Sequence, residues 1–352
     1  MPYQVTIAGS DRQFSAEPDE TLLNSAGHAG LALPWRCMDG SCGSCRARLI
    51  DGECILPDGA RLNADGDSGS AHAVLMCQAL PRSNLKLELP GIRSVDDVAC
   101  RVFDLELEEK RLLSPDILRL NFRVLGDESL RWLPGQYLEL LLDNGQRRAF
   151  SIANASDGGN RIELHVRHVA EGNFSRWAFE SLEEGMRLRA EGPLGTFVPR
   201  ENSERGLLFI AGGTGIAPIK AMIEHFAALG SHRPMELYWG TRQPGELYLG
   251  EQIDAWAEHV PQLRFVAVVS DPEVAIESDV RRGMVLDAVL ADHPQLAGFD
   301  VYVCGPPAMV DAATHAFAAT DLPSAQLFFD SYEYAPDLLA DILGQRAGIH
   351  AG

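Results

Sequence analysis

The sequence predicts a multidomain chain of α+β and α/β parts, and three observations lead to this class. Four cysteines in the first quarter of the chain have the spacing of a metal-cluster site. Between about residues 98 and 199, short strand-like segments follow one another and are separated by turn residues. From residue 205 onward, strand-like and helix-like segments alternate, which is typical of a parallel sheet covered by helices. A chain of 352 residues has room for two or three such domains.

The first domain, residues 1–94, is predicted to be a small sheet crossed by one helix, which is the β-grasp arrangement. Tyr3, Val5 and Ile7 alternate with polar residues and indicate the opening strand. The segment 21–30 has apolar residues at helical spacing and ends in glycine, so we expect a helix there. Further strands are expected at 47–50, in the apolar run before Cys77 and at 85–89, with a loop rich in Asp and Gly at 51–70.

The most informative pattern is C-x4-C-x2-C, formed by Cys37, Cys42 and Cys45, with a fourth cysteine far downstream at Cys77. One short loop and one distant ligand is the arrangement that holds a 2Fe–2S cluster in plant-type ferredoxins. Zinc sites usually have two paired C-x2-C hooks instead, so zinc is the weaker alternative. Small residues in the loop would let backbone N–H groups turn toward the cluster sulfurs. We predict these four cysteines as the cluster ligands, and Cys54 and Cys100 as buried apolar side chains.

The second domain, residues 98–200, is predicted to be an antiparallel β-barrel. Six strands at short intervals are expected, and closely spaced strands joined by turns favour a barrel or a sandwich. One helix interrupts them, beginning near Asn173 and ending near Leu182. The expected strands are 100–108, 117–124, 137–142, 147–154, 161–168 and 186–191.

The third domain, residues 205–335, is predicted to be a doubly wound parallel sheet. Strand, glycine-rich turn and helix follow one another at its start, and further strands and helices then alternate. The expected strands are 206–212, 235–240, 264–269, 300–304 and 325–329, and the expected helices are 216–228, 246–259, 284–291 and 308–320.

The barrel sequence contains a segment suited to a flavin, Arg148-Ala149-Phe150-Ser151. An arginine offers a forked cation to a pyrophosphate, and an aromatic ring can stack on a flavin. A serine hydroxyl can donate to flavin N5, where hydride arrives. The segment resembles the R-x-[YF]-S flavin motif of the ferredoxin–NADP reductase superfamily, with Phe150 in place of the commoner tyrosine. A plain strand with alternating charge is the alternative explanation.

Two neighbouring segments extend this resemblance. Gly172-Asn173-Phe174-Ser175 stands at a helix start, where backbone N–H groups can bind pyrophosphate, although an ordinary helix cap has the same appearance. Upstream, His165, Val166 and Arg167 fall where the superfamily lines the flavin with backbone groups. The resemblance therefore implies that both segments contact FAD.

Two turns of the third domain are suited to a nicotinamide nucleotide. Gly212-Gly213-Thr214-Gly215 lies directly between a buried-type strand and a helix, the context that a dinucleotide pyrophosphate needs. It resembles the G-G-T-G-[IVL]-[AT]-P turn of the same superfamily. Cys304-Gly305-Pro306 resembles the C-G-P turn that flanks the nicotinamide there. We assign Ser151 and Cys304 to the reaction site, with Cys304 neither a cluster ligand nor a covalent nucleophile.

The choice between NADH and NADPH depends on the residues that follow the second strand of this domain. A 2′-phosphate needs several cations, but only Arg242 is available beside Thr241, and Glu246 is near. The local sequence therefore favours NADH over NADPH. Near the end of the domain, Phe329 belongs to a stretch expected to return toward the flavin, and a place in the core explains such an aromatic residue equally well.

The order of the motifs resembles that of reductases in which a ferredoxin domain precedes the flavin and nicotinamide domains. This resemblance covers the chain to about residue 334 and implies the reductase component of an oxygenase or hydroxylase, which moves electrons from NADH through FAD to the 2Fe–2S cluster. Reductases of CDP-6-deoxy-glucoseen, which serve deoxysugar synthesis, have the same order and form the first alternative. A redox sensor is a more distant alternative from another functional class.

Composition limits the partners and the compartment. Hydrophobic residues make up 46% of the chain, and the formal net charge is −20, which argues against nucleic acid. The charge fits either steering toward a basic partner or a solvated acidic surface. The chain has no apolar run near the roughly 20 residues of a membrane helix. Its start resembles no secretory signal, and seven cysteines, four of them placed for metal, fit a reducing cytoplasm rather than a disulfide framework. We also expect a monomer.

Overall fold

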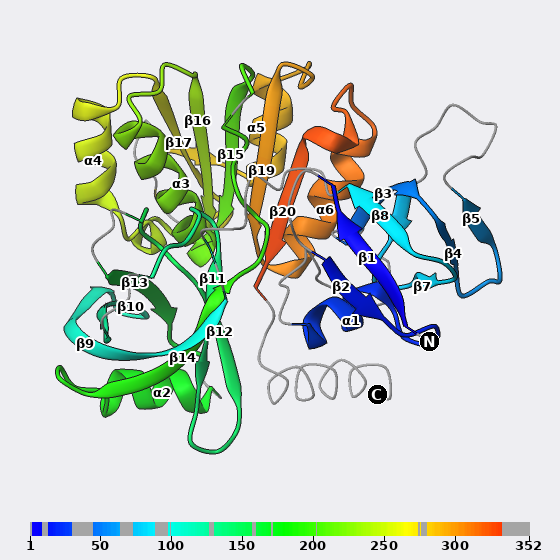
Figure 1. The fold of residues 1–352 in the computed structure, drawn as a ribbon. Helices are drawn as coiled ribbons and strands as arrows, with labels where there is room; N and C mark the ends of the chain where they lie inside the picture. Colours follow the sequence, from blue (N-terminus) through cyan, green and yellow to red (C-terminus); the bar gives the residue numbers. More distant parts are fainter. Residues whose placement is uncertain are drawn as a thin grey trace, which may run out of the picture. The chain divides into compact units, whose positions relative to one another are not determined.

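The chain folds into two compact units, formed by residues 1–101 with 193–196 and by residues 102–192 with 197–352 (Figure 1). The computed structural model describes residues 2–8, 13–29, 45–63, 73–88, 98, 100–126, 130–156, 160–169, 172–201, 203–273, 275 and 280–332. Within these described residues, no helix is long and apolar enough to cross a membrane. Residues 95–97, between the first and second predicted domains, lie outside them.

The first unit contains a five-stranded sheet in the order β2-β1-β8-β3-β6 and one helix, α1 (Leu22–His28). Its apolar core includes Val5, Phe14, Leu22 and Leu87, all buried. A sheet with one helix packed against its core confirms the predicted small α+β unit. The strands of the sheet are β1 (Tyr3–Ile7), β2 (Gln13–Ala16), β3 (Arg46–Asp51), β6 (Ala73–Leu75) and β8 (Leu85–Glu88).

Two details of the first unit differ from the prediction. The segment 51–70, expected to be a loop, contains β4 (Glu53–Ile55) and β5 (Arg61–Asn63). β4 pairs with β5 on one side and with β7 (Leu80–Pro81) on the other, which forms a second small sheet. These strands have only two or three residues, so they show no measurable alternation. The short apolar strand β6 ends at Leu75, and Cys77 lies in the turn after it. Cys54 is buried as predicted, whereas Cys100 is only half-buried.

The second unit begins with six antiparallel strands in the order β12-β11-β14-β9-β10-β13. An isolated antiparallel bridge between Ile152, just after β12, and Leu164 in β13 joins the two ends of this order. The six strands therefore close as the predicted barrel, and α2 (Asn173–Glu180) packs Phe174 and Ala178 into its core. The strands are β9 (Arg101–Ser114), β10 (Ile117–Val124), β11 (Tyr137–Leu141), β12 (Arg147–Ser151), β13 (Arg161–Arg167) and β14 (Arg187–Leu194).

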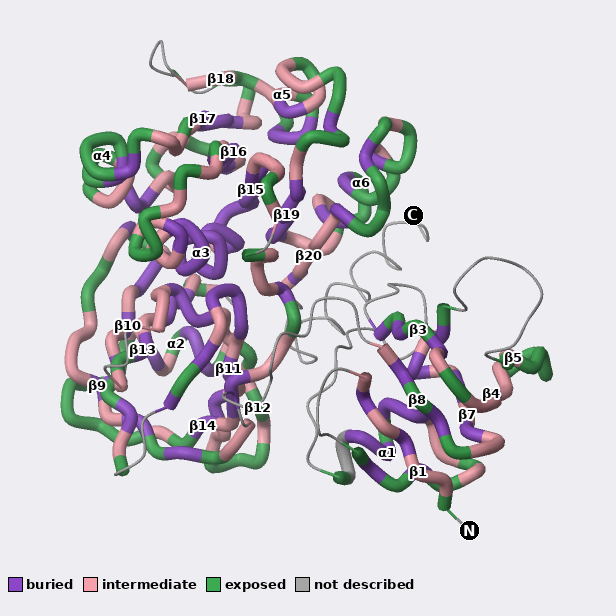
Figure 2. The backbone as a smooth tube through the Cα atoms, turned by 45° about the horizontal axis from the view of Figure 1, so that its top comes forward, coloured by how far each residue is buried: buried purple, intermediate pink, exposed green. Residues whose placement is uncertain are grey.

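A parallel sheet follows in the order β18-β17-β16-β15-β19-β20, which confirms the doubly wound prediction. Its strands run next to one another with β15 at the centre, and nearly every residue of β15 and β19 is buried (Figure 2). The strands are β15 (Gly206–Gly212), β16 (Met235–Thr241), β17 (Leu263–Val269), β18 (Arg281–Arg282), β19 (Phe299–Gly305) and β20 (Leu327–Ser331).

Two helices cover each face of this sheet. Apolar residues of α3 (Ile216–Ala228) and α4 (Gly250–His259) join one core cluster, and those of α5 (Val285–Asp292) and α6 (Pro307–Ala318) join the other. The helix expected from residue 246 begins at Gly250 instead, because a 3-10 turn, η3 (Pro244–Glu246), comes first. The two-residue strand β18 was not predicted, since two residues carry no periodic signal.

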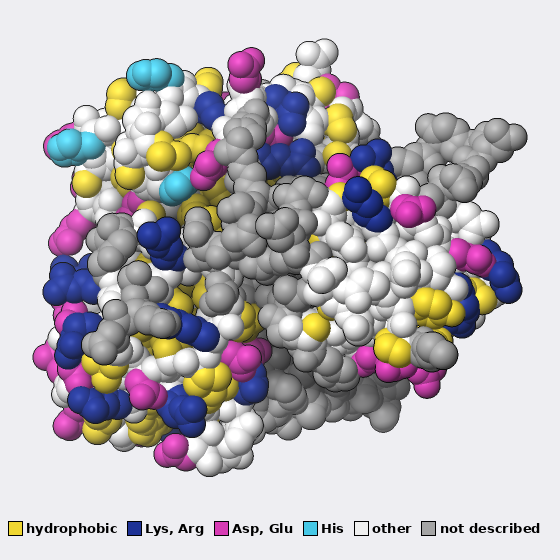
Figure 3. Space-filling model, in the orientation of Figure 1, with side chains coloured by type: hydrophobic (Ala, Val, Ile, Leu, Met, Phe, Trp, Pro, Cys, Tyr) yellow, Lys and Arg dark blue, Asp and Glu magenta, His cyan; other side chains and the backbone are white. Residues whose placement is uncertain are grey.

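The surface of this unit carries both charge signs in close alternation. Basic and acidic side chains are interspersed over its antiparallel end (Figure 3), where ion pairs such as Arg123 with Glu108, at 3.2 Å, link neighbouring strands. Such exposed pairs contribute little to stability. The interspersed charges are what a solvated strand surface requires, and they indicate no single-sign patch on the face in view.

Candidate cofactor and nucleotide sites

Two of the four predicted cluster ligands lie together in the first unit. Cys45 precedes β3 and Cys77 follows β6, and these two strands are paired. Both thiols are buried, and their Sγ atoms are 3.1 Å apart. This distance is well beyond the 2.05 Å of a disulfide, so the two sulfur atoms are not bonded to each other. Cys37 and Cys42, the other two predicted ligands, lie outside the described residues.

Two adjacent buried thiols, next to the ends of two paired strands, fit a thiolate-bound cluster. Thiolate is the ligand that iron–sulfur clusters require, and a largely apolar surrounding is typical of such sites. Cys54, in the same unit, does not share this place. Burial raises the pKa of its thiol to about 11, so the group stays protonated at neutral pH.

The predicted flavin segment lies on β12, the first strand in the strand order of the barrel. Ser151 ends this strand opposite Tyr137, and both are half-buried. Phe150 lies beside Phe174 of α2, with ring centroids 5.2 Å apart. The Arg148 guanidinium donates to the Gln146 side chain at 3.2 Å, and Ala149 beside it is exposed. The structure therefore brings two of the predicted segments, on β12 and α2, into direct contact.

The start of α2 has backbone N–H groups that no side chain caps. Gly172 occupies the N-cap position in an extended conformation, and no side chain caps the helix there. A β-carbon on Gly172 would lie 2.7 Å from the Ser175 hydroxyl oxygen. The Ser175 hydroxyl is engaged locally, since it donates toward the carbonyl of Gly172 at 3.0 Å and accepts from the Val169 amide at 3.1 Å. Any anion contact from this segment therefore comes from backbone groups, including that of Asn173, rather than from Ser175.

The glycine turn after β15 and the turn after β19 pack directly against each other. A β-carbon on Gly215 would lie 2.1 Å from the Cys304 carbonyl oxygen, and one on Gly212 would lie 2.9 Å from Pro306. Gly213 has a φ of +52°, the left-handed region that favours glycine. The structure thus joins the two predicted nicotinamide segments at the carboxyl edge of the parallel strands, where open α/β sheets bind their ligands.

Side chains from three directions surround the glycine turn. The Trp239 indole N–H donates to the Gly213 carbonyl at 2.9 Å, and the Tyr332 hydroxyl donates to the Gly212 carbonyl at 3.2 Å. The Arg167 guanidinium, which comes from β13 of the barrel, is 3.2 Å from the position that a β-carbon on Gly213 would take. Thr214 completes the short turn η2 (Gly213–Gly215), and Cys304 and Gly305 end β19 beside it. Because Arg167 belongs to the predicted flavin segment, the flavin and nicotinamide segments meet at this point.

Phe329 packs onto one face of the parallel sheet, and its contact with the flavin stays a prediction. Its side chain packs against the apolar cluster on the α5 and α6 face of the sheet. Its neighbour Phe328 faces the other side and stacks on Tyr302, with ring centroids 4.7 Å apart. Both rings therefore contribute to the core, and the aromatic residue of this stretch that reaches the glycine turn is Tyr332.

The end of β16 and the loop after it, residues 241–246, contain charged side chains that form ion pairs. The Thr241 hydroxyl donates to the Gln243 carbonyl at 3.0 Å, so it is used within the loop. Arg242 forms an ion pair with Glu246 at 3.2 Å, and Glu246 also meets Arg167 at 3.4 Å. Glu246 thus links the barrel strand to the loop, a role for which the sequence contained no signal.

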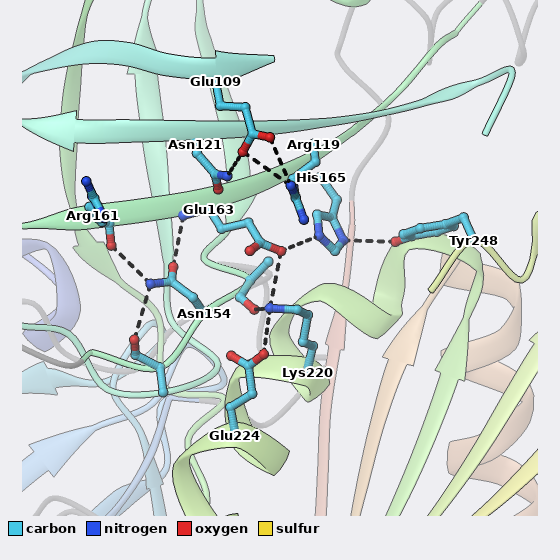
Figure 4. A network of polar contacts seen from close by, with 12 residues as sticks. Glu109, Arg119, Asn121, Asn154, Arg161, Glu163, His165, Lys220, Glu224 and Tyr248 are labelled. Carbon is cyan, nitrogen blue, oxygen red and sulfur yellow. Dashed lines mark hydrogen bonds and ion pairs between the residues drawn. The ribbon is translucent and has the colours of Figure 1, made fainter. Parts of the chain in front are cut away.

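A buried polar network joins the barrel to the nucleotide domain (Figure 4). His165 has no exposed side-chain surface, and its ring nitrogens contact the Tyr248 hydroxyl at 3.0 Å and Glu163 at 2.8 Å. Lys220 of α3 meets Glu163 at 3.2 Å and Glu224 at 2.8 Å. His165 was predicted to contact the flavin through its backbone. That contact concerns the backbone and stays a prediction, while the side chain points to the nucleotide domain, as alternation along a strand allows.

The pKa values in this network follow from burial and from Lys220. Burial would raise the pKa of Glu163, but its hydrogen bond to His165 and the charge of Lys220 outweigh burial and lower the pKa to about 2. Burial lowers the pKa of His165, so its ring is neutral at pH 7. Burial raises the pKa of Glu224, against the opposing effect of Lys220. The Lys220 ammonium group is therefore shared by the carboxyl groups of Glu163 and Glu224.

Known proteins match this chain along almost its whole length. Three family models match in succession: a 2Fe-2S iron-sulfur cluster binding domain at residues 5–82, an oxidoreductase FAD-binding domain at 104–198 and an oxidoreductase NAD-binding domain at 209–315. The CDP-6-deoxy-L-threo-D-glycero-4-hexulose-3-dehydrase reductase of Yersinia pestis is 34% identical over 94% of this chain and 99% of its own length. The chain belongs to the family of iron–sulfur flavoprotein reductases.

Other members of this reductase family agree with that assignment. Reductase component 1 of the terephthalate 1,2-dioxygenase of a Comamonas species is 32% identical over 96% of this chain and 99% of its own length. The crystal structure of the Amycolatopsis cytochrome P450 reductase GcoB superposes with a TM-score of 0.70 at 30% identity, covering 94% of this chain and 98% of that one. This reductase is therefore an NAD(P)H-dependent oxidoreductase with a ferredoxin domain, an FAD-binding domain and an NAD(P)-binding domain, as the sequence predicts.

Proposed function

We propose that this reductase uses NADH and delivers electrons to a separate oxygenase or hydroxylase component. The observation that carries the proposal is the meeting of β13, the glycine turn and the Cys304 turn at one edge of the parallel sheet. Reductase components of oxygenase systems are among the full-length relatives. Residues 1–94, 98–200 and 205–335 are the proposed limits of its three domains.

The residues divide the work of holding the reactants. Backbone groups of β13, Ser151 and the start of α2 are proposed to hold FAD, with Arg148 at its pyrophosphate and Ser151 at the reacting nitrogen. The turn Gly212–Gly215 and the Cys304 turn are proposed to hold the nicotinamide nucleotide, with Arg167 between the two groups. Cys37, Cys42, Cys45 and Cys77 are proposed to bind the cluster. When bound, FAD accepts two electrons as hydride and the 2Fe–2S cluster carries one electron at a time.

Preference for NADH is supported by the pairing of Arg242. Within residues 241–246, all described, Arg242 is the one cationic side chain, and the Glu246 carboxylate already pairs with it. A 2′-phosphate would have to compete with that carboxylate. We expect kcat/KM for NADH to exceed that for NADPH at least about tenfold, which equals about 1.4 kcal/mol. Equal values for the two nucleotides would contradict the preference.

A second acceptor has specific support. The 34% identity to a CDP-6-deoxyhexulose dehydrase reductase spans nearly the whole of both proteins, so a sugar-nucleotide dehydratase is the alternative partner. We also propose a cytoplasmic monomer, in which the thiols stay reduced.

The proposed function is tested first without any partner. The purified protein should show flavin and iron–sulfur absorption bands that bleach when NADH is added under anaerobic conditions. It should then reduce ferricyanide rapidly and leave organic substrates unchanged when no partner is present. Mixing with an oxygenase component or with a sugar-nucleotide dehydratase then identifies the acceptor. A colourless protein after anaerobic reconstitution with iron, sulfide and FAD would overturn the proposal.

A further inference from the structure

Strand β13 presents two different faces to the two halves of the second unit. Its residues Ile162, Leu164 and Val166 are buried in the barrel core. The residues between them, Glu163 and His165, point away from that core and toward the nucleotide domain (Figure 4). Alternation along a strand produces this division. The strand proposed to cradle the flavin therefore also meets the domain proposed to hold the nicotinamide.

Three successive outward positions of β13 each contact a group of the nucleotide domain. Glu163 meets Lys220 at 3.2 Å, and His165 meets the Tyr248 hydroxyl at 3.0 Å. Arg167, at the end of the strand, meets Glu246 at 3.4 Å. These positions span about 13 Å of strand, at roughly 3.3 Å per residue. Contacts spread over such a length fix the direction of the strand as well as its distance from the nucleotide domain.

Lys220 is the centre of these contacts. Its ammonium group has three N–H donors, and three acceptors surround it: Glu163 at 3.2 Å, Glu224 at 2.8 Å and the Ala153 carbonyl at 3.1 Å. Ala153 comes two residues after Ser151, and Lys220 lies on the helix that begins directly after the glycine turn. One side chain, only 6% exposed, therefore connects the glycine-turn helix to both predicted flavin strands.

Apolar contacts also join the two halves, so Lys220 is not needed to hold them together. Ile117 and Phe197 of the barrel region are buried in the same cluster as Ile216 and Ile219 of α3. Apolar packing is non-directional, whereas hydrogen bonds from an ammonium group have defined acceptors. The apolar cluster thus holds the barrel and the nucleotide domain together, and the Lys220 contacts fix their exact relative position.

We propose that Lys220 is a positioning residue for hydride transfer. Through its contacts with Glu163 and the Ala153 carbonyl, it fixes the position of the flavin strands relative to the nicotinamide domain. This role rests on the proposed function. It does not require Lys220 to touch either ring. A misplacement of about 1 Å in reacting groups can slow a reaction roughly a hundredfold, so loss of these contacts should reduce the rate more than the affinity.

The test compares four holoproteins: wild type, Lys220→Met, Lys220→Met/Glu163→Gln and Lys110→Met. Methionine is one atom shorter than lysine and carries no charge, and a pocket of about 400 Å³ lined in part by Lys220 adjoins the site. The double variant also removes the charge of Glu163, one of the two carboxyl groups that Lys220→Met leaves without their cation. Lys110 is the matched control, because its ammonium group donates to the carbonyls of Phe179 and Leu182 within the barrel alone.

Rapid mixing with NADH should separate rate from affinity. We expect Lys220→Met to lower the limiting rate of flavin reduction about tenfold to a hundredfold, with little change in the apparent Kd for NADH. The primary isotope effect with NADH deuterated at C4 should rise, since the hydride step then limits the rate more fully. The double variant should regain part of the lost thermal stability but not the rate. Lys110→Met should reduce flavin at the wild-type rate.

Amide hydrogen exchange provides a readout that needs no turnover. Exchange on β13 and on residues 148–153 should speed up at least about tenfold in Lys220→Met and stay unchanged in Lys110→Met. A wild-type limiting rate in Lys220→Met, a changed Kd with an unchanged rate, or recovery of rate together with stability in the double variant would each overturn the role. If NADH does not reduce the wild-type protein, the proposed function fails, and the role of Lys220 in hydride transfer fails with it. Amide hydrogen exchange would still decide whether Lys220 fixes the position of the barrel relative to the nucleotide domain.

Discussion

At the scale of single residues, Gly215 shows how closely the two nucleotide turns approach each other. A β-carbon at this position would lie 2.1 Å from the Cys304 carbonyl oxygen and 2.9 Å from the Gly305 amide nitrogen. Both neighbours are backbone atoms of a buried strand end, so neither can move away as the end of a flexible side chain would. The spacing of the two turns thus depends on the absence of one methyl group.

We therefore expect Gly215→Ala to push the Cys304 turn away from the glycine turn. The variant should lose about 1–3 kcal/mol of stability through overpacking and should bind NADH more weakly. Thermal unfolding and NADH titration of the purified protein measure both effects. Gly298→Ala is the matched control, because a β-carbon there has no neighbour within 4 Å. Equal behaviour of the two variants would show that the turns are not in the contact described.

At the scale of elements, the accuracy of the sequence prediction follows the length of each periodic pattern. The strand 206–212 and the helix 216–228 were predicted at their observed limits, because long apolar runs and a glycine turn mark them. The strands β4, β5 and β7 have two or three residues and were missed. Local patterns thus predict elements that are long enough to repeat.

The site was predictable to the extent that its residues are contiguous in sequence. Motifs indicated the glycine turn, the Cys304 turn and β12, but no local signal indicated the pairing of Glu163 with Lys220. These residues are far apart in the chain, and a charged residue that alternates with apolar ones is typical of a solvent-facing position. Tyr248 was missed for the same reason, since only tertiary packing brings it to the site. The stretch that contains Tyr332 was expected near the flavin, but the prediction selected Phe329 within it.

A second buried ion cluster lies at the opposite, amino-terminal edge of the parallel sheet. Asp300, at the start of β19, is fully buried and accepts from Arg205 at 2.9 Å and from Arg233 at 3.0 Å. Arg205 precedes β15 and Arg233 precedes β16, so one carboxylate joins the starts of three neighbouring strands. The cluster holds the sheet together at a distance from the nucleotide turns.

Asp300→Ala should therefore destabilise the second unit without changing its chemistry. Removal of the carboxylate leaves two guanidinium groups without their anion, and breaking a buried pair in this way costs about 3–5 kcal/mol. Asp104→Ala is the control, because Asp104 and Arg189 are mostly exposed and 3.8 Å apart, and such a pair contributes about 1 kcal/mol or less. Denaturant unfolding followed by flavin fluorescence measures the difference. A reduced flavin-reduction rate in folded Asp300→Ala protein would contradict the separation of the two edges.

At the scale of the whole molecule, the two compact units divide the predicted chemistry. Cys45 and Cys77, the two predicted cluster ligands within the described residues, belong to the first unit. The predicted flavin strands and both nucleotide turns belong to the second, where the contacts of Arg167 and Lys220 join barrel to parallel sheet. Hydride transfer should therefore depend on the second unit alone, and delivery to a partner should require the first.

Cys77→Ser tests this division. Loss of one buried thiolate should remove the iron–sulfur absorption bands and electron delivery to a protein partner, because the cluster needs four thiolates. Reduction of ferricyanide by NADH should continue, since every residue proposed to hold FAD and nicotinamide lies in the other unit. Cys54→Ser is the control: this cysteine is buried in the same unit, and its protonated thiol makes it a poor ligand, so the bands should remain. Loss of ferricyanide reduction together with the cluster, in protein that retains its FAD, would show that the two units do not work independently.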